Sequence, residues 1–335
     1  MTMIEYPKFK ACAAHVAPVF LDATATVEKA CSLITEAASN GAGLIAFPES
    51  YVPGFPVWAS IQAPIKNHSF FKRLAANSIA VPGPEVTQLC KAAREAAIVV
   101  SIGISERSPV SVGALWNSNL LIDVNGTIVN HHRKLVPTFY EKLIWAPGDG
   151  AGLRVSDTPI GKLGMLICGE NTNPLARYSL IAQGEQVHIS SYPPVWPTRP
   201  SNEPGRYDLA AAIRIRAGAH SFEGKVFNIV SSAFLDNGTL DALHGIDREA
   251  RATLEQSPQA VSMVIGPSGE VSSDTLCEVE GLLYQDIDIS HCVEPKQFHD
   301  VVGYYNRFDV FDLRVNRKRI VPITFPDEEG NEHAR

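Results

Sequence analysis

Three predicted strands of the sequence each end in a side chain that serves nucleophilic chemistry in many enzymes. A carboxylate (Glu49), an ammonium (Lys134) and a thiol (Cys168) stand at the carboxyl ends of these short strands. In layered α/β folds, ligands bind in the mouth outside the carboxyl ends of the strands. If the three strands are neighbours, we expect the three side chains to converge at one such mouth.

A carboxylate, an ammonium and a thiol are together sufficient for nucleophilic acyl chemistry. A thiol near its ordinary pKa of about 8.5 is mostly protonated at neutral pH and needs activation. A carboxylate can accept its proton, and a neighbouring ammonium lowers the thiol pKa and stabilises negative charge on the attacked group. Cys168 is followed by Gly169, whose backbone N–H lies near the start of an expected helix and suits an oxyanion hole.

Each of these residues also has an ordinary structural explanation. A glutamate after a strand often begins a helix, a lysine there often faces solvent, and a buried cysteine often only fills space. A cysteine–histidine site would need a partner such as His188 or His220, but neither stands in a recognisable catalytic motif. His131 and His132 are adjacent on an expected strand, so they point to opposite faces and form a poor metal pair. We therefore expect neither a metal nor another cofactor.

The composition is that of a globular protein with a sizeable core, and it restricts the kind of partner. Among 335 residues, 45% are hydrophobic and 19% are charged. The net charge of −7 offers no excess of positive charge to attract nucleic acid or an anionic membrane. The six cysteines form no CxxC pair, and neither a signal peptide nor an apolar run of membrane-spanning length is seen. These features favour a cytoplasmic protein with free thiols.

Strand and helix patterns alternate along the chain without a linker, a repeat or a low-complexity segment. Helices are expected at 24–40, 84–97, 174–183 and 207–223, and strands at 8–16, 44–47, 98–105, 119–124, 127–133, 163–167, 187–191, 227–232, 260–265 and 282–287. This alternation, with hairpin turns at Asn125-Gly126 and Gly161, predicts an α/β fold with mixed sheets covered by helices. We expect one domain at 1–290 and a C-terminal extension at 291–335 that takes part in subunit contacts or is partly disordered.

Three segments carry a resemblance to a known family. They contain Glu49, Lys134 and Cys168 in that order, and they read GLIAFPESYVPGFP, HHRKLVPTFYEKLIWAPGDG and GMLICGENTNPLARYSLIAQGEQVHISSYPPVWP. In order and spacing they resemble the Glu–Lys–Cys pattern of the nitrilase superfamily, and the resemblance covers roughly residues 8 to 310. It implies a carbon–nitrogen hydrolase domain with a four-layer αββα sandwich, which agrees with the strand and helix pattern.

The resemblance implies a role for each site residue. Glu49 becomes the general base, Lys134 the electrostatic stabiliser and Cys168 the nucleophile, while Glu141 matches an additional active-site glutamate of the family. The Cys-x-Glu-Asn run and the Pro174-Leu175 pair resemble the nitrile-cleaving branch. The family also implies a homo-oligomer, either a dimer or a larger and sometimes spiral assembly, that acts on a small-molecule nitrile.

Two positions depart from the pattern of the nitrile-cleaving branch. Gly169 stands where its members usually have tryptophan, and Tyr304 stands where a C-terminal family segment often has histidine. We expect the glycine to open space beside the nucleophile, which affects the range of substrates. The tyrosine concerns the C-terminal segment and its part in assembly.

These features predict hydrolysis of an uncharged organic nitrile to its carboxylic acid and ammonia. Cys168 attacks the nitrile carbon to give a thioimidate, Glu49 activates water, and a thioester is then hydrolysed. We expect the pocket walls to come from loops after the same strands, at Phe55, Trp58, Thr138, Trp145, Pro193 and Trp196. Each of these six side chains can equally serve only to pack its loop.

Three other functions stay open at this level. An amidase of the same superfamily uses the same residues, as does an amide-forming enzyme whose thioimidate expels the thiol before ammonia leaves. A catalytically silent binding or scaffold member is the third, although Glu49, Lys134 and Cys168 are all present. Product analysis separates the enzymes, because a nitrilase releases acid and ammonia.

Overall fold

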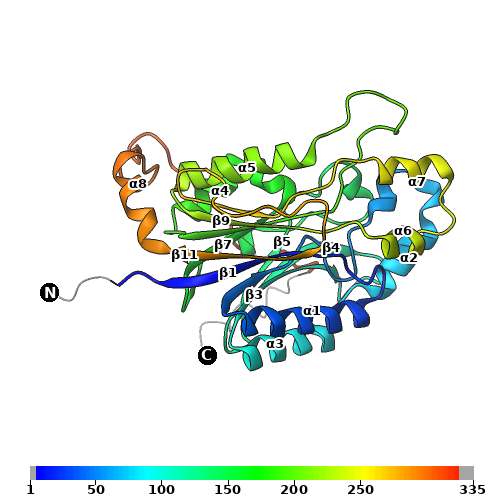
Figure 1. The fold of residues 1–335 in the computed structure, drawn as a ribbon, viewed down its shortest axis with the longest axis horizontal. Helices are drawn as coiled ribbons and strands as arrows, with labels where there is room; N and C mark the ends of the chain where they lie inside the picture. Colours follow the sequence, from blue (N-terminus) through cyan, green and yellow to red (C-terminus); the bar gives the residue numbers. More distant parts are fainter. Residues whose placement is uncertain (1–4, 324–335) are drawn as a thin grey trace.

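In the computed structural model, which describes residues 5–323, two β-sheets lie face to face between two outer layers of helices (Figure 1). The first sheet has six strands in the order β11-β1-β2-β3-β4-β5, which are β11 Gly281–Asp288, β1 Lys8–His15, β2 Ala42–Ala46, β3 Val99–Arg107, β4 Leu115–Ile122 and β5 Ile128–Arg133. The second has five strands in the order β10-β9-β8-β7-β6, which are β10 Met263–Ile265, β9 Phe227–Ser232, β8 Val187–Tyr192, β7 Gly161–Ile167 and β6 Ser156–Thr158. Parallel and antiparallel neighbours occur in both sheets, so both are mixed.

Helices cover the outer face of each sheet. The α-helices are α1 Ala23–Ser39, α2 His68–Asn77, α3 Pro84–Ala96, α4 Pro174–Ile181, α5 Leu209–Gly224, α6 Asn237–Ala242, α7 Arg248–Glu255 and α8 Val293–Phe298. In Figure 1, α1 and α3 lie below the first sheet, and α4 and α5 lie above the second. The four-layer αββα sandwich predicted from the sequence is therefore confirmed.

Strand β1 shows how the sequence builds these layers. Ala11 and Ala13 pack between the two sheets, whereas Cys12 and Ala14 pack with the buried side chains of α1 and α3. Successive side chains of a strand point to opposite faces, so a strand covered on both faces must be apolar throughout. Small side chains at these positions let the layers approach closely.

Strand directions place the ends of β2 and β5 at one edge of the first sheet. Strand β2 is parallel to β3, β3 is antiparallel to β4, and β4 is antiparallel to β5. Strands β2 and β5 therefore run the same way, although β3 and β4 lie between them. The three site-bearing strands are not neighbours within one sheet, since β7 belongs to the other sheet.

Most predicted elements are present, but some short ones differ from expectation. The helices α2, α6, α7 and α8 were not predicted, and α6 and α8 are too short for an apolar period to stand out. The strand expected at 260–265 shortens to β10, and the helix expected at 207–223 becomes α5. Shifts of one to a few residues at element ends are ordinary for sequence patterns.

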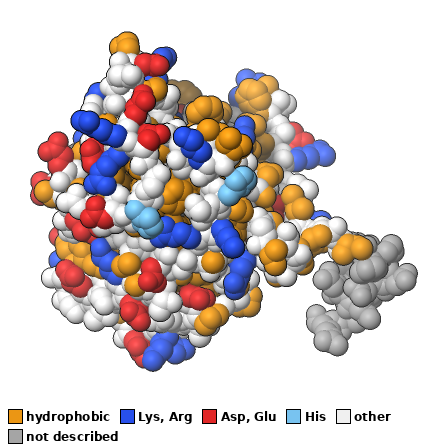
Figure 2. Space-filling model, turned by 90° about the vertical axis from the view of Figure 1, so that its right-hand side faces the viewer, with side chains coloured by type: hydrophobic (Ala, Val, Ile, Leu, Met, Phe, Trp, Pro, Cys, Tyr) orange, Lys and Arg blue, Asp and Glu red, His pale blue; other side chains and the backbone are white. Residues whose placement is uncertain are grey.

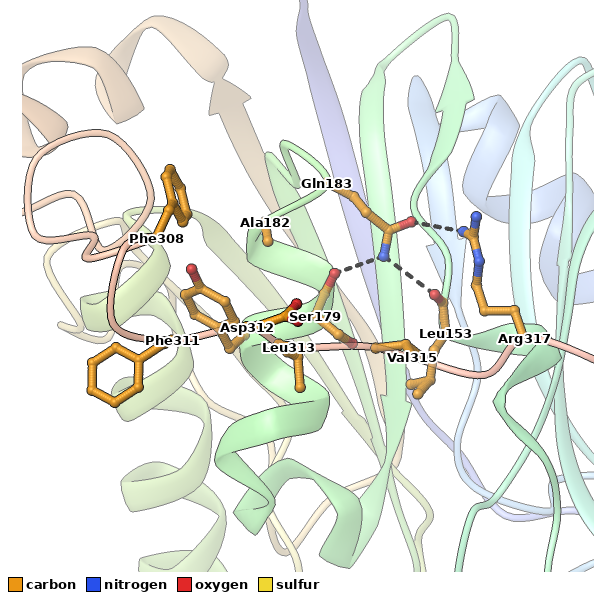
Figure 3. Close-up of a pocket in the computed structure, with 11 residues that line it drawn as sticks. Leu153, Ser179, Ala182, Gln183, Phe308, Phe311, Asp312, Leu313, Val315 and Arg317 are labelled. Carbon is orange, nitrogen blue, oxygen red and sulfur yellow. Dashed lines mark hydrogen bonds between the residues drawn. The ribbon is translucent and has the colours of Figure 1, made fainter.

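The C-terminal segment lies against α4. Residues 308–317, which come after α8 in the chain, lie beside α4. Together with α4 they line a cavity of about 530 Å³ (Figure 3). The Gln183 side-chain amide donates to the backbone carbonyls of Leu153 and Ser179. Its oxygen, Oε1, accepts from the Arg317 guanidinium, which ties this segment to the end of α4. The boundary between a domain at 1–290 and an extension at 291–335 stays a prediction, and residues 324–335 lie outside the described part.

The surface carries charges of both signs. On the face shown in Figure 2, acidic and basic side chains are interspersed with apolar ones. Among residues 5–323, no helix has the length and apolar character needed to cross a bilayer.

Candidate active site

The three predicted catalytic side chains meet in one buried cluster between the sheets. Glu49 lies three residues beyond β2, Lys134 lies directly beyond β5, and Cys168 follows β7 as the first residue of the 3-10 helix η5 Cys168–Thr172. Each of the three residues is at most 4% exposed. The two sheets thus contribute different parts: the first supplies the carboxylate and the ammonium, and the second supplies the thiol.

Lys134 lies between two carboxylates, and we call Lys134, Glu49 and Glu141 the lysine-centred cluster. Its Nζ donates to Glu49 Oε1 at 2.7 Å and to Glu141 Oε1 and Oε2 at 2.9 and 2.7 Å. Glu141 belongs to the 3-10 helix η3 Phe139–Leu143, and its Oε2 also accepts the Thr138 N–H at 2.8 Å. All three charged groups are fully buried, so their charges act in a medium that screens them poorly.

Glu49 keeps one oxygen free. Its Oε1 accepts hydrogen bonds from Lys134 and from the Asn117 amide, each at 2.7 Å. Its Oε2 is buried and has no hydrogen-bond partner within the described part of the chain. The Sγ atom of Cys168 and one carboxylate oxygen each of Glu49 and Glu141 lie within 4.8 Å of one another. A base with an unused lone pair therefore lies beside the thiol.

The surroundings keep the thiol protonated at rest. Burial raises the pKa of Cys168 well above its ordinary value, and the charge of Glu49 raises it further. Lys134 lowers this pKa, as expected from the sequence, but its effect is smaller than that of burial. The net change in the Cys168 pKa is therefore upward, so attack by sulfur requires a base in the same step.

The ammonium and the second glutamate respond to burial in different ways. Burial alone lowers the pKa of Lys134, but the carboxylates of Glu141 and Glu49 outweigh burial and hold this pKa above its ordinary value. Burial raises the pKa of Glu141 to about 7, because Glu49 adds to the effect and the opposing Lys134 charge offsets only part of it. Lys134 therefore stays charged, while Glu141 can exchange a proton near neutral pH.

The segment around the nucleophile is held to the segment around the lysine by Glu170. Its carboxylate accepts the N–H of Leu135 at 2.6 Å and the N–H of Ile167 at 2.9 Å. The ring of His132 donates to the same carboxylate at 2.9 Å. One buried side chain thus joins the residue after Lys134 to the residue before Cys168. His131, on the opposite face of the strand, contacts Glu106 instead.

Gly169 does not open space beside the nucleophile. A Cβ atom placed on this glycine would lie 2.7 Å from Thr138 Oγ1, which is closer than real contacts of this kind. The expectation of an empty volume is wrong because the Thr138 side chain occupies it. Gly169 is the second residue of η5, and the first N–H groups of a helix have no partner inside it.

The predicted pocket aromatics form a connected buried cluster. Phe55 lies 5.6 Å from Trp145 and 6.0 Å from Trp196 between ring centroids, and Tyr140 stacks on Trp196 at 4.4 Å. These rings belong to the same apolar core as Cys168. A cavity of about 360 Å³ adjoins them and includes Phe139, the residue before Tyr140, in its wall. Contact with substrate stays a prediction for these residues.

The remaining predicted wall residues have distinct surroundings. Trp58 is fully buried and stacks on Phe70 of α2 at 5.7 Å, and Pro193 is buried after β8. Thr138 is only partly buried and lies against Gly169.

Sequence reasoning missed Asn117. This residue lies on β4 between the two charged segments, where its amide donates to Glu49 and its carbonyl accepts the backbone N–H of Lys134. The signal was present in the run Asn117-Ser-Asn119, since polar side chains inside an apolar strand need buried partners.

Comparison with known proteins agrees with this geometry. Residues 10–297 match the family model described as carbon-nitrogen hydrolase. The chain is 33% identical to a nitrilase from Paraburkholderia phymatum over 94% of this chain and 88% of that protein. It is 34% identical to an aliphatic nitrilase from Rhodococcus rhodochrous, over 96% of this chain and 86% of that protein.

A solved structure supports the fold. A carbon-nitrogen hydrolase from Helicobacter pylori superimposes with a TM-score of 0.67 at 19% identity, over 90% of this chain and 97% of that chain. The fold, the family model and the curated relatives lead to one conclusion: this chain belongs to the nitrilase superfamily of carbon–nitrogen hydrolases.

Proposed function

We propose that this protein hydrolyses an uncharged organic nitrile to the carboxylic acid and ammonia. One observation carries the proposal: a buried thiol lies beside a carboxylate whose Oε2 is free and whose Oε1 accepts from an ammonium. This arrangement fits a reaction in which sulfur attacks an electrophilic carbon while its proton leaves. The nitrilase relatives support a nitrile as the source of that carbon.

In the first step, Cys168 Sγ forms a bond to the nitrile carbon. Glu49 accepts the thiol proton, and one electron pair of the triple bond moves to the nitrogen. The nitrogen then takes the proton from Glu49, which leaves a thioimidate. Lys134 and the Gly169 N–H stabilise the negative charge on the nitrogen while it develops. A base is needed here because burial keeps the thiol protonated.

In the second step, water adds to the thioimidate carbon. Glu49 accepts a proton from the water, the nitrogen is protonated, and the carbon–nitrogen bond breaks to release ammonia and leave a thioester. A second water then breaks the carbon–sulfur bond and releases the acid. Glu141 has a pKa raised by burial to about 7, which suits it to placing water or moving protons between these states.

The aromatic cluster favours an apolar substrate. Phe55, Trp145 and Trp196 pack in the same buried apolar core as Cys168, and an uncharged aliphatic or aryl-substituted nitrile suits walls of this kind. The Thr138 side chain beside Gly169 limits the group that can lie next to the sulfur.

Substitution of the nucleophile tests the proposal. We expect Cys168→Ala to abolish both ammonia release and the covalent adduct seen by intact-protein mass spectrometry, while the thermal unfolding midpoint stays close to that of the parent. A panel of aliphatic, arylacetonitrile and aromatic nitriles is assayed for acid, amide and ammonia. Acid with ammonia supports a nitrilase, amide alone indicates the amide-forming alternative, and turnover limited to amides indicates an amidase. Full turnover by Cys168→Ala overturns the mechanism.

We further propose a homo-oligomer that resides in the cytoplasm. The C-terminal segment exposes large apolar side chains, among them Tyr304, Phe308 and Phe311, as expected of a surface that contacts another subunit. All six cysteines are free, which suits a reducing compartment. Sedimentation of the full chain tests assembly, and we expect the double variant Phe308→Ser, Phe311→Ser to have a lower assembled mass than the parent. A parent that sediments as a monomer contradicts the proposal.

A further inference from the structure

A second buried cluster of titratable side chains takes no part in the proposed chemistry. Glu185, His188 and His220 lie between the second sheet and α5, and all three are at most 1% exposed. Glu185 Oε1 lies 2.7 Å from His188 Nδ1, and Glu185 Oε2 lies 2.7 Å from His220 Nε2. We call these three residues the glutamate-centred cluster.

The two imidazoles differ in what their second nitrogen meets. His188 Nε2 lies 2.9 Å from Asn171 Oδ1, whereas His220 Nδ1 has no hydrogen-bond partner within residues 5–323. Both ring nitrogens of His188 therefore lie against oxygen atoms, one of the Glu185 carboxylate and one of the Asn171 amide. His220 needs only the proton that it donates to Glu185.

The orientation of Asn171 is determined by its other contacts. Its Nδ2 donates to the carbonyl of Leu166 at 3.3 Å and to the carbonyl of Cys168 at 3.1 Å. Its Oδ1 must then face His188, and it also accepts the Ser190 hydroxyl at 3.1 Å. One amide thus joins the backbone on both sides of the nucleophile to the glutamate-centred cluster.

The backbone at the nucleophile needs such support. Cys168 has φ 49°, in the left-handed region that a residue with a side chain rarely adopts. Strained backbone of this kind persists only where surrounding contacts hold it. We call residues 166–171 the nucleophile turn, and Asn171 links the carbonyl of its strained residue, Cys168, to the carbonyl of Leu166 two residues earlier.

We propose that His188 is a positioning residue: paired with Glu185, it holds Asn171 so that the nucleophile turn aims the Cys168 sulfur at the substrate. His220 binds the other oxygen of Glu185 and stacks on the His188 ring at 3.7 Å between centroids, but within residues 5–323 no hydrogen bond joins it to the turn, so we assign it a structural part. The inference rests on the proposed role of Cys168 as nucleophile. It adds a chain of contacts that runs from Glu185 through His188 and Asn171 to the backbone of Cys168.

A matched pair of variants tests the proposal. His188→Phe and His220→Phe each remove one buried imidazole from Glu185, but only the first also removes the donor to Asn171. We expect His188→Phe to lower kcat for ammonia release by about 10- to 100-fold with a smaller change in KM, because a small displacement of the nucleophile is enough for such a loss. His220→Phe should keep kcat within about threefold, even where the two variants lose similar thermal stability.

Reactivity of the sulfur gives a readout that does not depend on nitrile turnover. The rate of Cys168 alkylation by iodoacetamide is followed by peptide mass spectrometry in the parent and in both variants. We expect slower alkylation in His188→Phe only, and restoration in His188→Gln, which keeps an N–H donor near the position of Nε2. If the parent hydrolyses no nitrile but the alkylation pattern holds, the proposed function fails and the positioning role stands.

A second variant covers the case in which His188→Phe does not fold. Asn171→Asp keeps the acceptor for His188 and Ser190 but replaces the N–H donors that hold the carbonyls of Leu166 and Cys168. The proposal expects a loss of kcat and of alkylation rate comparable to that of His188→Phe. Equal losses of kcat in the two histidine variants, or parent-like alkylation in Asn171→Asp, overturn it.

Discussion

The two buried clusters have opposite arrangements of acidic and basic groups. In the lysine-centred cluster one ammonium lies between two carboxylates, and in the glutamate-centred cluster one carboxylate lies between two imidazoles. Both are removed from solvent, and both use contacts of 2.7 Å. They differ in their hydrogen bonds: within the described residues Glu49 Oε2 has no partner, whereas both oxygens of Glu185 accept hydrogen bonds.

This difference separates a reactive site from a supporting one. A buried carboxylate with an unused lone pair can accept a proton, which is the property that a base needs. When both oxygens of a carboxylate accept hydrogen bonds, its ionised form is stabilised and the donor side chains are held in place. Glu185 illustrates this: burial tends to raise its pKa, but the charge of His188 and the hydrogen bonds of both histidines lower that pKa to about 2.

The largest expected effect is on activity. In Glu49→Gln the side chain keeps its size but loses the basic oxygen beside the thiol, so we expect kcat for nitrile hydrolysis to fall by about 10²- to 10⁴-fold. Folding should be retained, because Glu141 still pairs with Lys134 through both of its oxygens. Ammonia release and the thermal unfolding midpoint measure the two outcomes.

The matched change in the glutamate-centred cluster is Glu185→Gln. It removes the carboxylate that binds both His188 and His220 in a dry site, and we expect the free energy of unfolding to fall by about 3–5 kcal/mol. Chemical denaturation measures this loss. The comparison breaks down if Glu49→Gln loses as much stability as Glu185→Gln, or if it keeps parental turnover.

The next effect is an opposite pH dependence of stability in the two clusters. Burial lowers the pKa of His220 from 6.5 to about 4, so between these values the unfolded chain binds a proton that the folded chain does not. This group makes stability fall as the pH falls. Burial raises the pKa of Glu141 from 4.5 to about 7, so there the folded chain binds the extra proton and stability rises as the pH falls.

Two variants separate these contributions. Between about pH 5 and 6, His220→Phe should make stability rise more steeply on acidification than it does in the parent, and Glu141→Gln should do the reverse. Each change in slope approaches about 1.4 kcal/mol per pH unit, the value for one proton. Urea denaturation at several pH values measures the slopes, and a shift of both variants in the same direction would refute the assignment.

A further expected effect concerns the packing beside the nucleophile. In Gly169→Ala the new Cβ meets Thr138 Oγ1 at 2.7 Å, so we expect a loss of about 1–3 kcal/mol in the free energy of unfolding. Thr138→Ala removes the obstructing hydroxyl, and the double variant should recover about 0.5–1 kcal/mol of that loss. A strictly additive double variant shows that the two side chains do not compete for the same volume.

Much of the fold could be predicted from the chain itself. Period-two and period-3.6 patterns predicted most of the helices and strands, and the order of Glu49, Lys134 and Cys168 indicated the superfamily that the comparisons establish. These signals are local, since each depends on residues within a few turns or strand pairs. Short elements such as α6 and α8 were missed for the same reason, because six residues are too few to show a helical period.

The chain by itself determined which reactive side chains exist and which strand each one follows. Only the tertiary structure decided that two different sheets bring them together, that burial raises the pKa of the Cys168 thiol, and that Thr138 fills the space beside Gly169. It also decided the link from His188 through Asn171 to the nucleophile. Solvent exclusion and hydrogen bonding act between residues that are distant in the chain, such as Glu49 and Lys134, which are 85 positions apart. A local pattern holds no information on which distant groups will share one buried volume.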